Sequence, residues 1–280
     1  MASLTGPLYI PAPNPITPRY GLFRVATGPM DLPINARSGG VQYQVSTCNL
    51  PLEYEVECQD AHNTKVISSG VTTVTGAPFI VYSAIQCGAV GLVDFGQEEV
   101  QRYLYNQLIA GEQATVEDIF SQGLVGQFPS LQSGAVSLGA AQGPVQAVSM
   151  LEDWLYARFG SRGVIHAPME AAAYFKGAHL IEPDGDVYRG SGVWRTEVGT
   201  AVSFGNYAGV GPTGQAGTWI YITGPVAIWR TPDSELFVPP MGQVINRSTN
   251  VLTIVMEREY VLTYDCYSAA VEVTLDTTDQ

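Results

Sequence analysis

Charge is scarce in this 280-residue sequence, and lysine is almost absent. Only Lys65 and Lys176 are lysines, and 13 basic residues stand against 26 acidic ones, for a formal net charge of −13. Non-specific binding to nucleic acid needs clustered Lys and Arg, and no short window holds such a cluster. The composition therefore argues against direct nucleic-acid binding. It leaves room for an acidic wall that encloses packed nucleic acid without binding it.

Charged residues make up only 14% of the chain, against about 25% in an ordinary soluble domain. A surface this poor in charge often has much of its area covered by partners. The alternative is an ordinary β-rich domain with uncharged polar loops. The 30 glycines, 18 prolines and 15 tyrosines indicate many turns and much sheet in either case.

Cysteine and long apolar runs are also scarce. The four cysteines show no CxxC spacing, and they are Cys48, Cys58, Cys87 and Cys266. In a chain of this length we expect buried thiols and no disulfide framework. No basic and apolar leader opens the sequence, and no run approaches the length of a membrane span. We therefore expect a protein made in a reducing cytosol, with no membrane contact.

Motifs for catalysis or cofactor binding are missing. GVGPTG (209–214) matches a dinucleotide-binding pattern, but Pro212 interrupts it and a β run follows, so we interpret it as a loop. His62, His166 and His179 are not spaced for a metal site. The sequence predicts no enzyme, cofactor or metal. A hydrolase that uses His166 with partners distant in sequence stays as the third hypothesis below.

The clearest regular element runs from Asp94 to Gly123. Its apolar residues recur at steps of three and four, and they are Val100, Tyr103, Leu104, Leu108, Val116, Ile119 and Phe120. Asp94 stands where an N-cap belongs, and Gly123 can end the helix in the left-handed conformation. Gly111 is the place where we expect a bend or break. One face should pack on the closing strands around residues 251–264.

Two segments before this helix have no core of their own. Residues 1–40 carry seven prolines, which favours an extended arm laid across another surface. Residues 41–76 alternate as a long two-stranded ribbon with a turn at 60–63, and a ribbon alone is marginal in water. Both segments therefore need partners.

The remainder mixes helices and strands. We expect a helix from Pro144 to Gly160, a buried strand at 163–167, a short helix from Pro168 to Gly177 and a turn at 182–186. TWIYITGPVAIW (218–229) reads as one or two apolar strands, and the chain closes in strands after Asn250. The fold class is α+β.

This order of elements resembles the major capsid proteins of tailed bacteriophages, whose fold is shared with encapsulin shells. The resemblance rests on the helix QEEVQRYLYNQLIAGEQATVEDIFSQG and on the closing strands ITGPVAIWR and MEREYVLTYDC. LEDWLYARFGSRGVIHAPMEAA and GTWIYITGPVAIWR are similar to structural proteins of actinobacterial phages. The resemblance implies an N-terminal arm (1–40), an extended loop (41–76) and a peripheral domain (77–142 and 240–280) with a spine helix (94–123). It also implies an axial domain (143–239).

The leading hypothesis is thus a shell protein that self-assembles into hexamers and pentamers around double-stranded DNA, without sequence-specific binding. It would be assembled in the host cytoplasm and reside in the virion. Portal and decoration proteins are possible partners, and a separate scaffolding protein is expected if one is used. The second hypothesis is another virion component, such as a tail-tube, head-completion or decoration protein. The third is a β-rich hydrolase.

Contacts between subunits are expected from the arm and the ribbon. The residues predicted to make them are Ile10, Pro11, Tyr20, Phe23, Tyr54, His62 and Lys65. Some members of the family join a loop lysine to an asparagine of another subunit. The resemblance makes Lys65 the lysine for such a bond, with Asn246 and Asn250 as possible partners.

Overall fold

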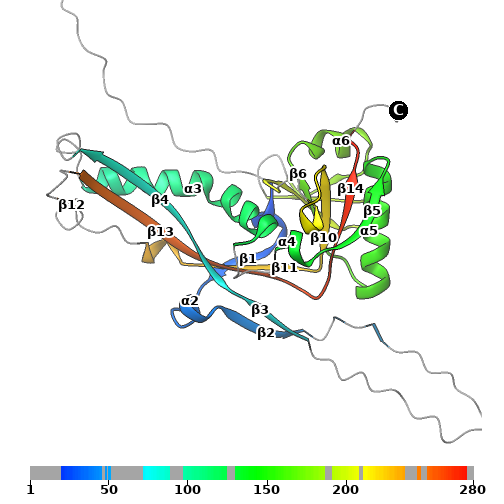
Figure 1. Cartoon of the computed structure of the whole chain (residues 1–280), viewed down its shortest axis with the longest axis horizontal. Helices are drawn as coiled ribbons and strands as arrows, with labels where there is room; N and C mark the ends of the chain where they lie inside the picture. The colour runs from blue at the N-terminus through cyan, green and yellow to red at the C-terminus, as the bar shows by residue number, and fades with distance from the viewer. Residues whose placement is uncertain are drawn as a thin grey trace, which may run out of the picture.

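The computed structural model consists of two β-sheets, a β-ribbon and a long helix (Figure 1). It describes residues 20–45, 48, 50–51, 72–88, 97–124, 130–186, 191–207, 211–236, 245–246 and 251–275. A long sheet with the helix lying along it forms one end of the molecule, and a broader sheet flanked by helices forms the other (Figure 1). The predicted α+β class is confirmed.

The long sheet is built around one 14-residue strand, β13 (Val251–Tyr264). β4 (Pro78–Gly88) runs antiparallel to it over the whole of β4. On the other edge, β11 (Val226–Arg230) and β12 (Ile245–Asn246) pair with opposite ends of β13, and β1 (Thr27–Asp31) lies parallel to β11. The strands expected after Asn250 thus form the centre of this sheet.

The second sheet has seven strands in the order β5-β14-β10-β6-β9-β8-β7. Their bounds are β5 Val136–Ala141, β6 Val164–Pro168, β7 Glu182–Asp184, β8 Val193–Arg195, β9 Ala201–Gly205, β10 Trp219–Thr223 and β14 Ser268–Val273. Two predictions are wrong here. The expected turn at 182–186 begins with strand β7, and Pro168 ends β6 and does not start a helix.

The chain passes between the two sheets at two neighbouring places. Gly224-Pro225 separates β10 from β11, and residues 265–267 separate β13 from β14. The two crossings are hydrogen-bonded, since the Gly224 N–H donates to the Tyr267 carbonyl at 3.1 Å and the Asp265 N–H to the Pro225 carbonyl at 3.0 Å. A Cβ at Gly224 would lie 2.4 Å from the Asp265 carbonyl oxygen. That the chain crosses between the two sheets at these places was not predicted from the sequence. The predicted domain boundaries stay a prediction.

The predicted spine helix is α3 (Gln97–Gln122), and its bounds agree closely with the expectation. Gly123 ends it at φ 81°, as predicted, whereas Asp94 lies outside the described residues. The helix continues through Gly111, so the expected break is absent. Tyr103 was assigned to the buried face wrongly, because its side chain is 55% exposed.

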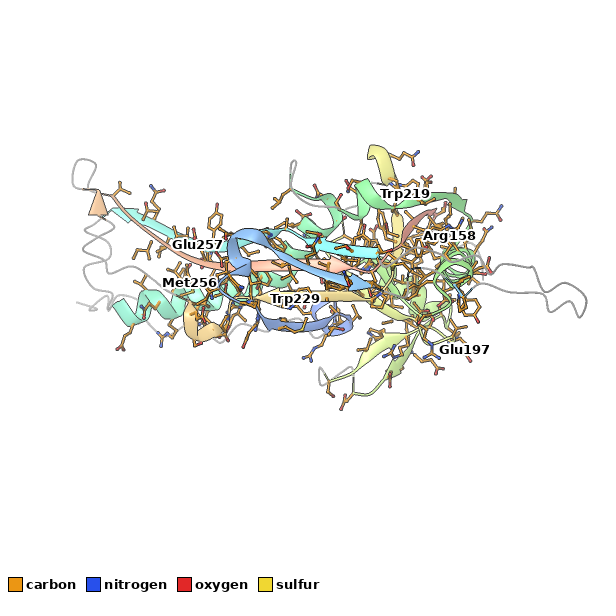
Figure 2. The ribbon with its side chains drawn as sticks, turned by 90° about the horizontal axis from the view of Figure 1, so that it is seen from below. Arg158, Glu197, Trp219, Trp229, Met256 and Glu257 are labelled. Carbon is orange, nitrogen blue, oxygen red and sulfur yellow. A yellow bond between two sulfur atoms is a disulfide. The ribbon has the colours of Figure 1, made fainter. Side chains whose placement is uncertain are left out.

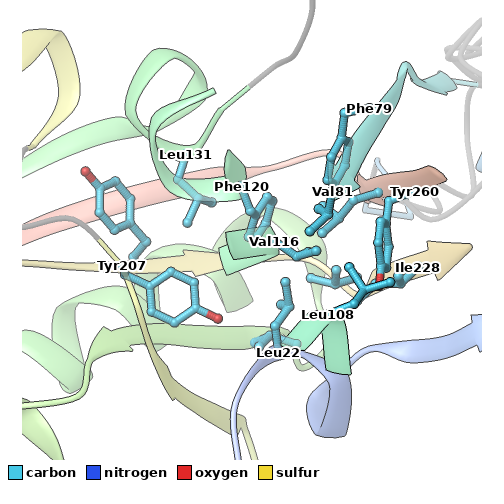
Figure 3. Close-up of a cluster of buried hydrophobic side chains, with 14 of the residues drawn as sticks. Leu22, Phe79, Val81, Leu108, Val116, Phe120, Leu131, Tyr207, Ile228 and Tyr260 are labelled. Atoms are coloured by element: carbon cyan, nitrogen blue, oxygen red, sulfur yellow. The ribbon is translucent and has the colours of Figure 1, made fainter. Parts of the chain in front are cut away.

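The helix packs on the long sheet as predicted. The cluster between them and the near face of the seven-stranded sheet includes Leu22, Phe79, Val81, Val100, Leu104, Leu108, Val116, Phe120, Leu131, Tyr207, Tyr221, Ile228, Ile254, Met256 and Tyr260 (Figure 3). On β13, neighbouring residues face opposite ways: Met256 is buried and Glu257 is exposed (Figure 2). Alternation along the strand therefore separates the core face from an open face.

A second cluster fills the far face of the seven-stranded sheet. There α5 (Pro144–Phe159) and α6 (Ala171–Gly177) cover the sheet. Alternate residues of β10 serve the two clusters, with Trp219 and Tyr221 on one side and Ile220 and Ile222 on the other. A strand buried on both faces explains the uninterrupted apolar run in the sequence. The α5 helix begins at Pro144 and ends at Gly160 (φ 62°), as predicted.

Residues 20–40 are folded onto their own chain and are not an extended arm. They form α1 (Leu22–Val25), β1 and α2 (Ala36–Gly39), and Leu22 is fully buried. After them, β2 (Val41–Val45) and β3 (Thr72–Gly76) pair antiparallel, as the predicted ribbon requires. The described residues also form a short helix, α4 (Leu131–Gly134), and the 3₁₀ turns η3 (Pro212–Gly214) and η4 (Asp233–Glu235). Residues 1–19 and 52–71 lie outside the described residues.

Candidate functional site

The residues predicted to contact other subunits are only partly placed. Ile10, Pro11, Tyr54, His62 and Lys65 lie outside the described residues. The Tyr20 side chain is 41% exposed, and its carbonyl accepts a hydrogen bond from Gln113 at 2.8 Å.

Phe23 is used within its own chain. Its ring stacks with Tyr260 at a centroid distance of 6.1 Å, and it packs against the cluster under α3. The structure thus leaves Tyr20, and not Phe23, as the more open of the two placed residues. The subunit contacts themselves stay a prediction.

The base of the ribbon is tied to the crossing between β13 and β14. The Tyr43 hydroxyl donates to Asp265 Oδ1 at 2.7 Å and lies 3.0 Å from Thr263 Oγ1. Burial raises the pKa of Tyr43 to about 12, so this hydroxyl stays protonated. Tyr43 also packs against Trp229, at a centroid distance of 6.1 Å.

A disulfide joins Cys48 to Cys266, with Cα atoms 5.3 Å apart, and the Tyr267 hydroxyl donates to the Cys48 carbonyl. The prediction of buried free thiols is therefore wrong for this pair. The two cysteines are 218 residues apart, and only the fold brings them together. The ribbon is thus fixed where the chain changes sheets.

A buried ion-pair network links α3 to the long sheet. Arg258 on β13 has no exposed surface, and it pairs with Glu112 of α3 and with Asp233. Glu112 also accepts hydrogen bonds from Arg230 NH1 at 2.8 Å and from the Tyr260 hydroxyl at 2.5 Å. A buried charge needs such partners to offset its desolvation. The network therefore holds the helix on its sheet in one register.

Glu117 forms a second junction, between three parts of the fold. Its carboxylate is 2% exposed and accepts the backbone N–H of Leu22 at 2.9 Å and that of Asn206 at 2.8 Å. Burial raises the pKa of Glu117 to about 7, and the hydrogen bonds from the two N–H groups and from Gln113 lower it. The side chain joins α3, the first residue of α1 and the residue after β9.

His166, the catalytic residue of the hydrolase hypothesis, is completely buried. Its Nε2 lies 2.9 Å from Thr223 Oγ1 and its Nδ1 lies 3.3 Å from the Tyr207 hydroxyl, which is 2.6 Å from Ser203 Oγ. Because Thr223 Oγ1 donates to the Gly224 carbonyl at 2.8 Å, it accepts from His166, and Nδ1 accepts from Tyr207.

Burial lowers the pKa of His166 to about 3. A neutral histidine with both ring nitrogens hydrogen-bonded, and with no exposed surface, has no substrate to act on. The arrangement is a satisfied polar chain inside the core, and it gives the hydrolase hypothesis no support.

The described ranges contain neither a metal-binding cluster nor a membrane-spanning helix. No group of three or more His, Cys, Asp or Glu side chains in these ranges could hold a metal ion. No helix in the same part of the chain is long and apolar enough to cross a membrane. The Gly-rich pattern at 209–214 contains η3 and no α-helix, so the described part of it agrees with the loop interpretation.

Comparison with solved structures finds relatives in fold along nearly the whole chain. A chain of the capsid of the native GTA particle matches with a TM-score of 0.60 and 12% identity, covering 98% of this chain and 96% of that one. The fold is that of phage capsid proteins. Chains from Microbacterium phage Oxtober96 (TM-score 0.57, 11% identity) and Mycobacterium phage Cain (0.56, 13%) match with coverages of 98% and 99% of this chain and 96% and 97% of theirs.

No protein-family model matches the chain, and no curated protein matches it in sequence. At identities of 11–13%, the likeness to the solved structures is one of fold. The recognised order of elements is confirmed at the level of the fold.

Glu112, Arg258 and Glu117 were not predicted from the sequence, although the sequence holds a signal for the first two. Every fourth residue from Val100 to Phe120 is buried, and all of these residues except Glu112 are apolar. Arg258 likewise falls on the face of β13 shared by Met256 and Tyr260. One acidic residue on the apolar face of the helix and one basic residue on the apolar face of the strand together predict a buried ion pair.

Proposed function

We propose that this chain is a major capsid protein, which associates with copies of itself as hexamers and pentamers and forms the icosahedral shell around phage DNA. The observation that carries the proposal is the fold match over more than nine-tenths of both chains, including a GTA capsid chain. A structural role without catalysis fits the interior, because the buried side chains of His166, Glu117 and Glu112 form hydrogen bonds with groups of the protein itself.

Two features of the chain support shell formation on physical grounds. Only 14% of residues are charged, so a large part of the surface can be covered by neighbours at small desolvation cost. The ribbon is anchored at its base by a disulfide and by Tyr43, which gives an extended element the rigid attachment that it needs to reach another subunit. Many weak contacts of this kind close a shell through avidity.

Negative-stain microscopy of the purified full chain tests the proposal. We expect closed shells of uniform diameter, formed alone or with scaffolding and portal proteins of the same phage. Rings or tubes would favour a tail-tube or head-completion protein. Protein that stays monomeric at every concentration, with and without those partners, would contradict both.

Lys65 is proposed as a contact residue, and the chain supplies its own control. Only one other lysine exists, Lys176, whose Nζ lies over the Trp194 ring at 5.3 Å. If Lys65 forms an amide with an asparagine of a neighbour, ammonia leaves and assembled shells give covalent ladders in denaturing gels. Lys65→Arg should abolish the ladder and Lys176→Arg should keep it. Shells without any ladder would exclude the covalent bond.

A further inference from the structure

Three arginines of this lysine-poor chain line one pocket. Arg24 comes from α1, Arg162 from the loop between α5 and β6, and Arg195 from β8. The pocket has a volume of about 230 Å³ and no carboxylate among its lining residues. Its other walls are mostly apolar, with Val164, Val193, Ala201, Pro225 and Val226 among them.

Two of the arginines meet at the turn that precedes β9. Arg195 NH1 donates to the Gly199 carbonyl at 3.0 Å, while the Arg162 guanidinium lies against Gly199 on its Cα side. A Cβ at Gly199 would lie only 2.7 Å from Arg162 NH1, and the φ of +88° also requires glycine there. The absence of a side chain at residue 199 thus lets two guanidinium groups approach the same place.

The positive charge of the pocket is largely uncompensated. Arg195 donates through Nε to the exposed carboxylate of Asp184 at 2.6 Å. Arg24 and Arg162 form no ion pair with any residue in the described part of the chain, and both are exposed. Like charges held together raise the local potential, and apolar walls reduce its screening.

We propose that the Arg24–Arg162–Arg195 pocket is an anion site that receives a carboxylate side chain from a second copy of this chain. Guanidinium groups bind carboxylates in bidentate geometry, and a pocket of this size accommodates one side chain. With 26 acidic and 13 basic residues, copies of the chain repel one another unless their carboxylates meet the few arginines. The assignment of the donor rests on the proposed shell function.

A duplex is the less suitable occupant. Duplex binding needs a stripe of Lys and Arg that follows successive phosphates. Here the three charges converge on a recess between α1 and the seven-stranded sheet. We therefore assign the pocket to protein carboxylates, and the experiments below include the duplex as a competing outcome.

The first experiment tests the site without assembly. Sodium sulfate is titrated onto unassembled full-length protein, and the melting temperature is compared with that in sodium chloride of equal ionic strength. We expect a saturable rise for the wild type and for Arg102→Gln, an exposed arginine elsewhere, and none for Arg24→Gln/Arg162→Gln. An equal response in all three proteins would mean that the pocket is not an anion site.

The second experiment tests the donor. Under conditions in which the wild type forms particles, the double variant should give about tenfold fewer particles, and Arg102→Gln should match the wild type. Normal assembly of a double variant that has lost sulfate binding would overturn the second-copy assignment. If the wild type itself forms no particles, the proposed shell function fails, while the sulfate result still decides the anion site.

The third experiment examines the competing occupant. A fluorescent 20-base-pair duplex is titrated with unassembled protein, and anisotropy is measured at low salt. We expect no difference between the wild type and Arg24→Gln/Arg162→Gln. Binding by the wild type that the double variant loses would overturn the carboxylate assignment in favour of phosphate.

Discussion

The carboxylate of Glu117 accepts the backbone N–H of Leu22, a residue 95 positions earlier, at 2.9 Å. The bond fixes the start of α1 on the spine helix, next to the seven-stranded sheet. Gly205 has to be a glycine there, because a Cβ would lie 2.2 Å from Glu117 Oε2. A single buried acid therefore joins the spine helix both to α1 and to the end of β9.

Stability should depend on pH through Glu117. Its pKa is raised by burial from an ordinary 4.5 to about 7, so the folded protein binds more protons than the unfolded chain between these values. The free energy of unfolding therefore falls as pH rises from 4.5 to 7, by about 3 kcal/mol from this group. Glu117→Gln should remove this fall, as measured by urea denaturation at pH 4.5 to 8.

The matched control for that variant is Glu98→Gln, since Glu98 is exposed on the same helix. Its unfolding curve should follow the wild type at each pH. If the difference in stability between the wild type and Glu117→Gln does not change with pH, then the carboxylate is ionised throughout and the assignment is wrong.

The pH dependence of stability that comes from His166 should have the opposite sign to that from Glu117. Burial lowers its pKa to about 3, whereas the unfolded chain takes up the proton near 6.5. Its contribution to stability is complete above pH 6.5 and is lost as pH falls towards 3, by up to about 5 kcal/mol. His166→Gln keeps an N–H for Thr223 and should be less sensitive than the wild type to acid below pH 6.5. An unchanged acid transition by circular dichroism would contradict this.

The sequence predicts local elements well and distant pairings poorly. The ladder of every fourth residue defines α3, and the apolar run at 218–229 marks β10 and β11. That these two adjacent strands belong to different sheets is not visible locally, because both are apolar and only Gly224-Pro225 separates them. The Cys48–Cys266 disulfide was missed for the same reason, since no spacing rule connects residues 218 apart.

The three-arginine pocket was also beyond sequence reasoning. Arg24, Arg162 and Arg195 are far apart along the chain, so no short window of the sequence shows them as a basic cluster. Charge clusters made by a fold become visible only in three dimensions.

Reduction of the disulfide should loosen the ribbon. We expect Cys48→Ser/Cys266→Ser to lower the free energy of unfolding by about 2–4 kcal/mol and to speed proteolysis within residues 46–71. Wild-type protein treated with dithiothreitol should behave like the double variant. Tyr43→Phe removes the hydroxyl bond to Asp265 alone and should have a smaller effect. Identical proteolysis rates with and without reductant would show that the disulfide does not restrain the ribbon.

Replacing Gly111 with alanine should stabilise the protein. An added Cβ meets nothing within 4 Å, and the residue is exposed within an unbroken helix. Gly111→Ala should therefore raise the free energy of unfolding by about 1 kcal/mol. Gly211→Ala is the contrasting variant, because its Cβ would lie 2.1 Å from the Trp219 ring. Destabilisation by Gly111→Ala in thermal melts would indicate that the helix bends there in solution.

The Glu112–Arg258 pair should behave as a strongly coupled unit. Glu112→Leu leaves a completely buried guanidinium short of its main partner and should cost about 3–5 kcal/mol. Arg258→Leu removes one of the two arginines that pair with the Glu112 carboxylate, and Arg230 remains as its partner at 2.8 Å.

The double variant Glu112→Leu/Arg258→Leu should lose much less stability than the sum of the two single variants, because no buried charge of the pair remains to be compensated. The pair of Glu99 and Arg102, 3.7 Å apart on the same helix and much more accessible than Glu112 and Arg258, provides the control cycle, with an expected coupling under about 0.5 kcal/mol. Urea denaturation of the seven proteins, with the wild type shared, measures both cycles. Additive losses at Glu112 and Arg258 would mean that the helix is held on the sheet by its apolar ladder alone.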